Sequence, residues 1–393
     1  MSKKIILKGI TVVLLSMLAS NSYAQINAEV STTTSYDNNI YLTPDKISDF
    51  IEDAELRLGY FIKPHPQKSV LSLYNNFEYI AYMQYGEKNI FLNNLGAAYV
   101  HALGKDKHVK LYLGGNWFLR KNRTEYNYYD YNQIYMYNNW QIQINKTFLK
   151  VGYNFRYRDY AYLTDLSNAQ HYLFLQLNHS FQTRTSIIFE TDFGYKSFKG
   201  VETYSVITVP TGRGGRHTTT SQTTSETVRP SMSHIIILAR VAQSITKKIG
   251  IYVQYKRQIS LTDKTDYINF DSYSQNDELF DEPFSYSSSG VSSKLTFIFP
   301  KAFKMEISGY YTKKNYISEK AYISEDDTEG LGDIREDTKQ GMNMNISKSF
   351  SPKNKHIQSI KTFLNYNYIY NQSNSYWYNY DNSTISFGLS FQF

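Results

Sequence analysis

The chain has 393 residues, with 42 Lys and Arg against 35 Asp and Glu, and its mean hydropathy is −0.49. It contains no cysteine, which excludes disulfides and thiol chemistry, and a net charge of +7 gives no general case for a nucleic-acid partner. The outstanding feature is aromatic content, with 38 Tyr and 23 Phe. Aromatic residues favour strands, and girdles of them mark both interfaces of membrane-spanning barrels.

The N-terminus reads as a secretory signal peptide. Three lysines precede the apolar run "ITVVLLSMLA" (10–19), and "NSYAQ" offers a small-x-small cleavage site after Ala24. The run is too short to span a bilayer as a helix, which takes about 20 residues, and no later segment approaches that length. We expect residues 1–24 to be a signal peptide and residues 25–393 to form a single domain.

Beyond the signal peptide, segments that alternate apolar and polar residues are separated by two kinds of connection. The long, variable kind includes a Thr- and Ser-rich stretch at 199–230 and acidic stretches near 263–286 and 319–337. The short kind is basic and occurs seven times, as "KPHPQK" (63–68), "GKDKH" (104–108), "NKTF" (145–148), "QTRT" (182–185), "TKK" (246–248), "PKAF" (300–303) and "SPKNKH" (351–356). The two kinds take turns, as periplasmic turns and outer loops do in transmembrane barrels.

This order predicts an all-β fold, a transmembrane antiparallel up-and-down β-barrel of about 16 strands. Seven short turns join fourteen strands, and a first strand near 27–41 and a last near 383–393 complete the count. The number is even and both termini fall on the periplasmic side, as in bacterial single-chain barrels. The alternative is a soluble sandwich whose apolar faces turn inward. Strands of about 11–14 residues favour the membrane, since soluble strands cluster near 5–6.

The last strand, "TISFGLSFQF" (384–393), alternates strictly and ends on an aromatic ring, Phe393. In a soluble protein it would be an exposed edge, so we expect it to close the barrel against the first strand, with its odd-numbered face in lipid. A C-terminal Phe behind alternating apolar residues resembles the sorting signal read by the outer-membrane barrel assembly machinery. We therefore expect that machinery and outer-membrane lipids as partners, and the bacterial outer membrane as the location.

No motif predicts catalysis, and we expect no catalytic residue, no metal site and no cofactor. His171 and His179 share a strand, but eight residues at strand rise is roughly 26 Å, too far to share one metal. The acidic stretches 324–337 and 276–282 match no calcium loop, so a solvated face is preferred to a cation site. The stretch 211–227 has Gly and Arg but no following helix, and we expect an outer loop, either flexible or folded inward as a constriction.

A barrel of sixteen strands leaves an aqueous channel, so the inward charges matter most. The period of two places these basic residues inward, against Glu55 and Glu306: Arg57, Lys110, Arg120, Lys150, Arg156, Arg158, Lys256, Lys294, Lys304 and Lys361. The candidate lumen and selectivity residues are Arg57, Arg120, Lys150, Arg156, Arg158 and Lys256. They predict a weak preference for anions, whereas lysines beside the short turns can equally face the periplasm and matter little.

The first hairpin, "SYDNNIYLTPDKISDFIEDAELRLGY" (35–60), resembles the opening of a group of outer-membrane β-barrel porins. Their pattern of Tyr-Asp-x-Asn followed by Ser-Asp-Phe matches Tyr36, Asp37 and Asn39, then 48–50. The resemblance implies a barrel associated with exopolysaccharide systems, and it carries over no functional residue.

Three functions are therefore open. The first is a porin-like channel for passive diffusion of small anionic or saccharide solutes. The second is an outer-membrane conduit for exopolysaccharide export. The third is a non-conducting surface structural or adhesive barrel whose loops close the pore.

Overall fold

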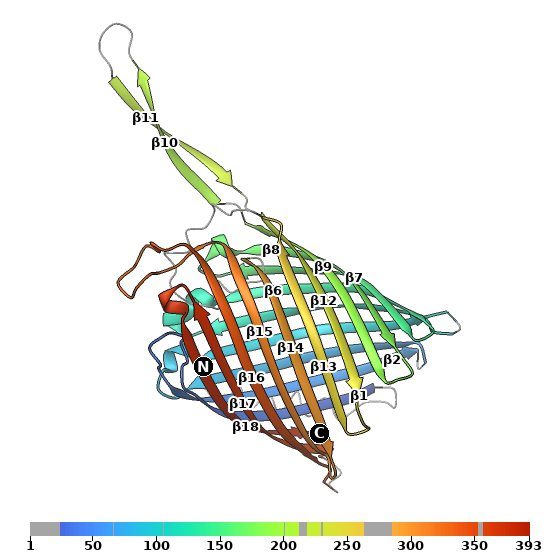
Figure 1. Cartoon of the computed structure of the whole chain (residues 1–393). Helices are drawn as coiled ribbons and strands as arrows, with labels where there is room; N and C mark the ends of the chain where they lie inside the picture. Colours follow the sequence, from blue (N-terminus) through green and yellow to red (C-terminus); the bar gives the residue numbers. More distant parts are fainter. Residues whose placement is uncertain are drawn as a thin grey trace, which may run out of the picture.

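The structure, a computed structural model, describes residues 24–65, 67–104, 106–199, 201–211, 218–228, 231–262, 285–352 and 357–393. Nearly all of the predicted signal peptide and the acidic stretch 276–282 lie outside these residues. The described part contains no helix long and apolar enough to cross a membrane. It forms a closed antiparallel barrel of sixteen strands and a separate two-stranded sheet (Figure 1).

Each barrel strand pairs with its neighbours along the chain, apart from the pairing of β9 with β12 and the closing pair. The strands are β1 (Ala24–Asp37), β2 (Asp49–His65), β3 (Ser69–Tyr82), β4 (Ile90–Leu103), β5 (Val109–Asn122), β6 (Tyr131–Ile144), β7 (Thr147–Tyr160), β8 (Asn168–Ser180), β9 (Thr185–Phe198), β12 (Ser231–Ser244), β13 (Ile249–Ser260), β14 (Tyr286–Phe299), β15 (Phe303–Lys320), β16 (Ile334–Phe350), β17 (Ser359–Ser373) and β18 (Tyr380–Gln392). Short 3-10 turns lie in four of the long connections: η1 (Gly86–Lys88), η2 (Thr124–Tyr129), η3 (Thr164–Leu166) and η5 (Tyr376–Tyr378).

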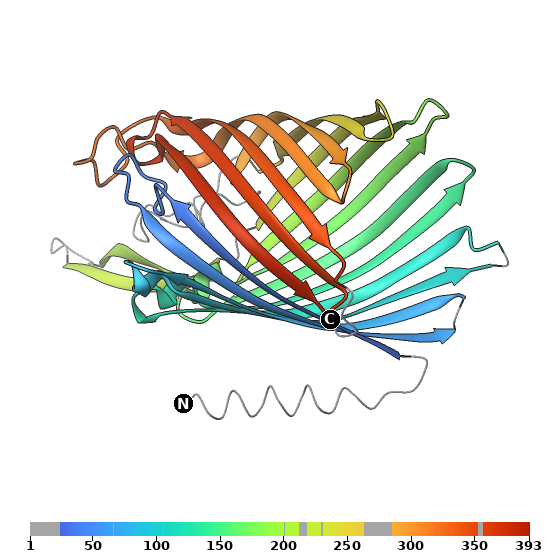
Figure 2. The same ribbon diagram turned by 90° about the horizontal axis from the view of Figure 1, so that it is seen from below.

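The last strand closes the barrel against the first, as predicted. Val30 stands opposite Phe391 and Tyr36 opposite Ile385, and the backbone N–H of Phe393 donates to the carbonyl of Ala28 at 2.8 Å. Figure 2 shows β18 lying beside β1 in the closed wall. Neither terminal strand therefore has a free edge.

Strand number and the alternation of short and long connections are both confirmed, but the first strand ends earlier than predicted. It stops at Asp37 because Asn39 leaves the ladder for a turn of its own. The side-chain amide of Asn39, which is fully buried, donates to the carbonyls of Thr43 at 2.8 Å and of Asp381 at 3.0 Å. Such an Asn turn replaces strand pairing with local hydrogen bonds.

The Thr- and Ser-rich stretch 199–230 is not merely a loop. It contains β10 (Val201–Thr211) and β11 (Thr218–Val228), which pair with each other and with no barrel strand. Figure 1 shows this hairpin outside the barrel. The physical reason is composition: the two strands are rich in Thr, Val and Ile, which are β-branched and favour extended pairing even in a polar segment.

The apolar face of the wall points outward. Leu173 is 55% exposed, Ile385 52% and Phe387 51%, values that a soluble core would not tolerate over a whole sheet. These residues alternate with inward polar ones along each strand, so the soluble sandwich is excluded by the fold. A band of this kind requires hydrocarbon around it.

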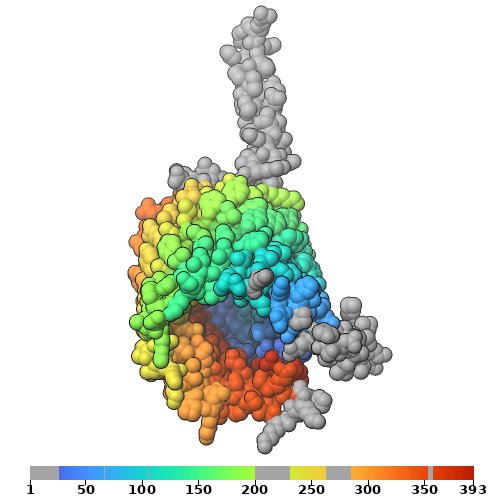
Figure 3. Space-filling model, turned by 90° about the vertical axis from the view of Figure 1, so that its right-hand side faces the viewer, coloured from blue at the N-terminus to red at the C-terminus, as the bar shows by residue number. Residues whose placement is uncertain are grey.

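The inner wall carries aromatic rings that lie over glycines of the next strand. The Tyr137 ring covers Gly114, Tyr310 covers Gly341 and Phe363 covers Gly388, so closely that an added Cβ would overlap each ring. An aromatic ring over a cross-strand glycine covers the exposed backbone and helps to fix the register of the two strands. The wall formed by the described strands encloses a hollow, which the space-filling view in Figure 3 shows.

Candidate functional site

The lumen wall is the candidate site, and contacts that skip a strand identify its inner face. Lys150 Nζ on β7 lies 5.8 Å from the ring centre of Tyr112 on β5, across β6. The rings of Tyr172 on β8 and His234 on β12 are 5.9 Å apart, across β9. Side chains two strands apart converge only on the concave side of a sheet, so this face lines the lumen.

Four inward cations gather on two strands, and we call them the cationic strip: Arg120 on β5, and Lys150, Arg156 and Arg158 on β7. Each lies beside an aromatic ring, which belongs to the wall in three cases and to η2 in the case of Arg120. The distances to the ring centres are 5.2 Å from Arg120 to Tyr129, 5.5 Å from Lys150 to Phe174, 5.8 Å from Arg156 to Tyr135 and 4.6 Å from Arg158 to Tyr131. Rings within about 6 Å of a cation stabilise it without cancelling its charge.

Neutral oxygens orient the guanidinium groups of the strip. Arg158 donates twice to Gln133 Oε1, at 3.3 and 3.2 Å, and Arg156 donates to Gln170 Oε1 at 3.4 Å. Arg156 Nε is buried without a hydrogen-bond partner, and within the described part of the chain neither Lys150 nor Arg156 makes an ion pair. The strip therefore presents positive charge to the lumen, while the unpartnered Nε of Arg156 stays buried in the wall.

Arg57 lies elsewhere, on β2, among carboxylates. Its Nε donates to Glu55 Oε1 at 2.5 Å, and its Nη1 is 3.6 Å from Glu29 Oε2. Asp53 and Glu78 face the lumen next to this pair. Glu78 on β3 stands opposite Glu55, and Asp53 precedes Glu55 by two residues on β2. These four carboxylates, which we call the acidic patch, offset the charge of Arg57.

The remaining predicted residues are inward but scattered. Lys256 on β13 stands opposite Leu238 and Gly290, far around the wall from the strip. Lys294 and Lys304 both pair with Glu306, at 2.8 and 3.0 Å. Lys110 and Lys361 stand opposite the inward Gln141 and Ser390, close to the short turns.

Several inward charges were not predicted. Arg240 on β12 donates from Nε to Gln254 Oε1 at 2.8 Å and lies 4.7 Å from the Tyr252 ring centre. Lys196 and Lys314 are inward and buried, and Glu190 and Asp192 face the lumen from β9. The alternation of inward and outward residues could have predicted these inward charges if it had been applied to every strand.

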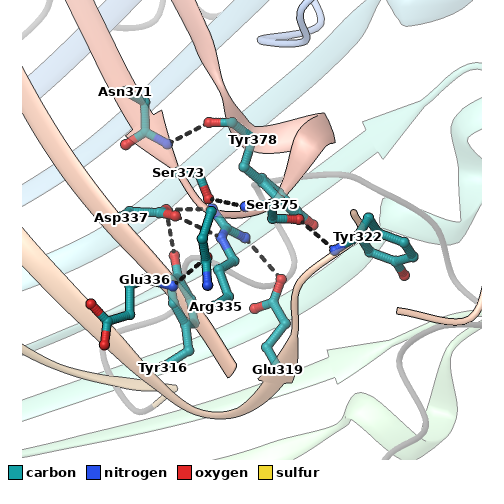
Figure 4. Close-up of polar contacts among 11 residues, drawn as sticks. Tyr316, Glu319, Tyr322, Arg335, Glu336, Asp337, Asn371, Ser373, Ser375 and Tyr378 are labelled. Atoms are coloured by element: carbon teal, nitrogen blue, oxygen red, sulfur yellow. Dashed lines mark hydrogen bonds and ion pairs between the residues drawn. The ribbon is translucent and has the colours of Figure 1, made fainter. Parts of the chain in front are cut away.

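A buried charge cluster fixes the long connection between β15 and β16, and we call it the rim cluster (Figure 4). Arg335 is 1% exposed and binds Asp337 with two hydrogen bonds, Nε to Oδ1 at 3.0 Å and Nη2 to Oδ2 at 2.5 Å. Its Nη1 reaches Glu319 at 2.8 Å, and its guanidinium carbon lies 3.1 Å from the ring centre of Tyr378 in η5. Tyr316 OH donates to Asp337 Oδ2 at 3.4 Å. The cluster joins three segments at one rim.

The acidic stretch 324–337 is ordered by its own backbone. Asp327 accepts four backbone N–H bonds, from Ile323 and Leu331 at 2.9 Å, Gly330 at 2.9 Å and Glu329 at 3.1 Å. Desolvation opposes the charge of Asp327, but these four donors outweigh it and lower the pKa of the carboxyl. Within the described residues, no three His, Asp or Glu side chains gather closely enough to hold a metal ion.

No family model matches the chain, and no curated protein does. Among solved structures, OpdL of Pseudomonas aeruginosa aligns at 10% identity and a TM-score of 0.48, covering 94% of this chain and 98% of OpdL. Pseudomonas aeruginosa OpdK with vanillate aligns at 8% identity and 0.49, covering 94% and 98%. OmpT, an outer membrane protein of Vibrio cholerae, aligns at 10% identity and 0.47, covering 96% and 99%. Sequence identities of 8–10% and TM-scores below 0.5 do not assign the chain to the family of any of these proteins.

The architecture of the barrel indicates the class of protein and its cellular location. Sixteen strands close without an edge, apolar side chains cover the outside, and charged and polar side chains line a hollow interior. Closed, even-numbered barrels with an apolar outer band, short turns at one end and long loops at the other are outer-membrane proteins. The chain is therefore a bacterial outer-membrane β-barrel of porin architecture.

Proposed function

We propose that the barrel is a passive diffusion channel for small solutes, with a weak preference for anions and room for saccharide rings. The observation that carries this proposal is the cationic strip: Arg120, Lys150, Arg156 and Arg158 on the lumen face, each beside an aromatic ring. Fixed positive charge on a pore wall raises the local concentration of anions and lowers their entry barrier. The acidic patch on β1–β3 limits the preference, which is why we expect it to be weak.

Aromatic rings in the same wall support saccharides as candidate solutes. Phe174 lies on the inner face close to Gly152, with Lys150 Nζ 5.5 Å from its ring centre, and the Arg156 guanidinium lies 5.8 Å from the ring centre of Tyr135. An aromatic ring beside a cationic side chain suits a sugar that carries a carboxylate, because the sugar stacks on the ring while the carboxylate accepts hydrogen bonds from the lysine or arginine.

The test is a planar-bilayer recording of the purified, refolded full chain under a KCl gradient. We expect discrete conductance steps, with Cl⁻ favoured over K⁺, and we expect the double variant R156Q/R158Q to lower that ratio about two- to fivefold. The matched control is K348Q, which removes one positive charge from the outer face and should leave the ratio unchanged. A preference for K⁺ in the unmodified barrel contradicts the role of the strip, and silence favours a non-conducting surface role.

A further inference from the structure

One polar row interrupts the apolar outer face of the barrel. Arg257 on β13 stands opposite Ser289 on β14, and Ser289 stands opposite Lys313 on β15. All three lie on the outward face, because Tyr255 and Tyr311 share that face two residues away and are 46% and 52% exposed. We call Arg257, Ser289 and Lys313 the outer basic row.

The row has a defined depth in the membrane. β13 and β15 run from short turns towards long connections, so Arg257 and Lys313 lie towards the outer rim of their strands. Tyr255, Val291 and Tyr311 form the next outward row on the periplasmic side. Exposed tyrosines on the lipid face mark the interface, so we infer that the outer basic row, one step beyond them and followed on β13 by the exposed Ile259, lies at headgroup level.

The charges of the row are only partly satisfied by the protein. Arg257 makes no hydrogen bond or ion pair within the described residues, whereas Lys313 Nζ lies 3.3 Å from Glu336 Oε2, with both side chains about half exposed. Glu336 on β16 thus offsets one of the two cations, and the guanidinium remains. An arginine on the lipid face is tolerated where lipid headgroups complete its hydrogen bonds.

We propose that the outer basic row binds the phosphate of a phosphorylated glycolipid in the outer leaflet of the outer membrane. Neighbouring strands are about 4.8 Å apart, so the Cα atoms of Arg257 and Lys313 are separated by about 10 Å. Both side chains are long enough to reach one phosphate placed over Ser289, whose hydroxyl adds a third donor. Arginine presents a planar fork that matches phosphate oxygens, and the acyl chains of the same lipid lie along the apolar face below.

The test is native mass spectrometry of the full barrel in detergent, titrated with diphosphoryl lipid A. We expect lipid adducts on the unmodified protein, and about tenfold weaker binding for R257Q/K313Q. K348Q is the control, because it removes an outward cation near the short turns of β16, and its binding should match the unmodified protein. A dephosphorylated form of the same lipid should bind about as weakly as lipid A binds to the double variant.

Folding is checked by the shifted migration of unheated barrels on denaturing gels. The single variant R257Q removes a side chain that has no hydrogen-bond or ion-pair partner among the described residues, so it should fold normally and still lose at least about threefold in affinity. Equal adducts on the unmodified and double-variant barrels, or equal binding of the dephosphorylated lipid, would overturn the proposal. So would displacement of lipid A by millimolar inorganic phosphate, which would assign the row to a free anion. None of these outcomes depends on channel activity.

Discussion

Replacing Arg335 by Gln should open the rim of the barrel locally. The substitution removes three charge-assisted hydrogen bonds, two to Asp337 and one to Glu319, and leaves Asp337, which is 2% exposed, without its cation. Three such bonds at about 1.5–3 kcal/mol each set an upper limit, and breaking a buried ion pair typically costs about 3–5 kcal/mol. We expect the free energy of opening the rim to fall by about 3–5 kcal/mol.

The chain supplies its own reporter for this experiment. Trp377 lies in η5 beside Tyr378, which stacks on Arg335, whereas Trp117 and Trp140 lie on the lipid face. In a background with the other two tryptophans changed to Phe, the fluorescence of Trp377 should change at a lower denaturant concentration in R335Q than in the unmodified chain. The denaturant concentration at which the whole barrel unfolds should be the same in both. The control is K46Q, which breaks the exposed ion pair of Lys46 with Asp381 and should cost about 0–1 kcal/mol. A loss below about 1 kcal/mol in R335Q would refute the argument from burial.

Two further predictions concern single contacts. Because the folded state lowers the pKa of Asp327, its stabilising contribution is present above the unfolded value of about 3.9 and is lost as pH falls through the folded value. The protection of the amides at 329–331 against hydrogen exchange, taken relative to the intrinsic exchange rate at each pH, should therefore fall in acid. In D327N this protection should already be low at pH 7, and protection that does not change with pH would contradict the role of the four donors. G114A places a Cβ against the Tyr137 ring, so the ring should swing into the lumen, with lower unit conductance and a stability cost of about 1–3 kcal/mol. Unchanged conductance would show that the ring does not border the permeation path.

The strands were predictable because membrane and water impose their pattern locally. Each residue of a barrel wall faces either lipid or lumen. Apolar and polar residues therefore alternate with a period of two along the strands. The last strand shows this without interruption over "TISFGLSFQF" (384–393). The inward position of all six candidate selectivity residues followed from that pattern, and their role in selectivity stays a prediction.

What could not be predicted depends on partners across strands. In β3, Asn75 and Asn76 are adjacent and polar, so the sequence does not tell which of them faces the lumen. Asn75 faces outward, where its oxygen accepts from Asn93 at 2.7 Å, and this places Glu78 inside with the acidic patch. The sequence places Glu55 beside Arg57 on the inward face of the same strand, but the second carboxylate, Glu29, reaches Arg57 only through the register of β1 and β2.

The rim cluster and the hairpin β10–β11 illustrate two other limits. Arg335, Glu319 and Tyr378 come from three separated segments, and nothing in their local sequence indicates burial. The stretch 201–228 is polar and lies outside the wall, and it was interpreted as a loop because it is a long connection. Its content of β-branched residues was the one sequence signal for the hairpin.

The pairing of Glu29 with Gln392 has a kinetic consequence. This contact joins opposite ends of the polypeptide, so it cannot form until synthesis and delivery of the whole chain are complete. Until then the growing sheet exposes unpaired backbone at both margins, the condition under which β-rich intermediates associate with one another. Closure is therefore expected as the slow, final event of maturation, and a chain truncated before residue 380 should accumulate as aggregates in the envelope.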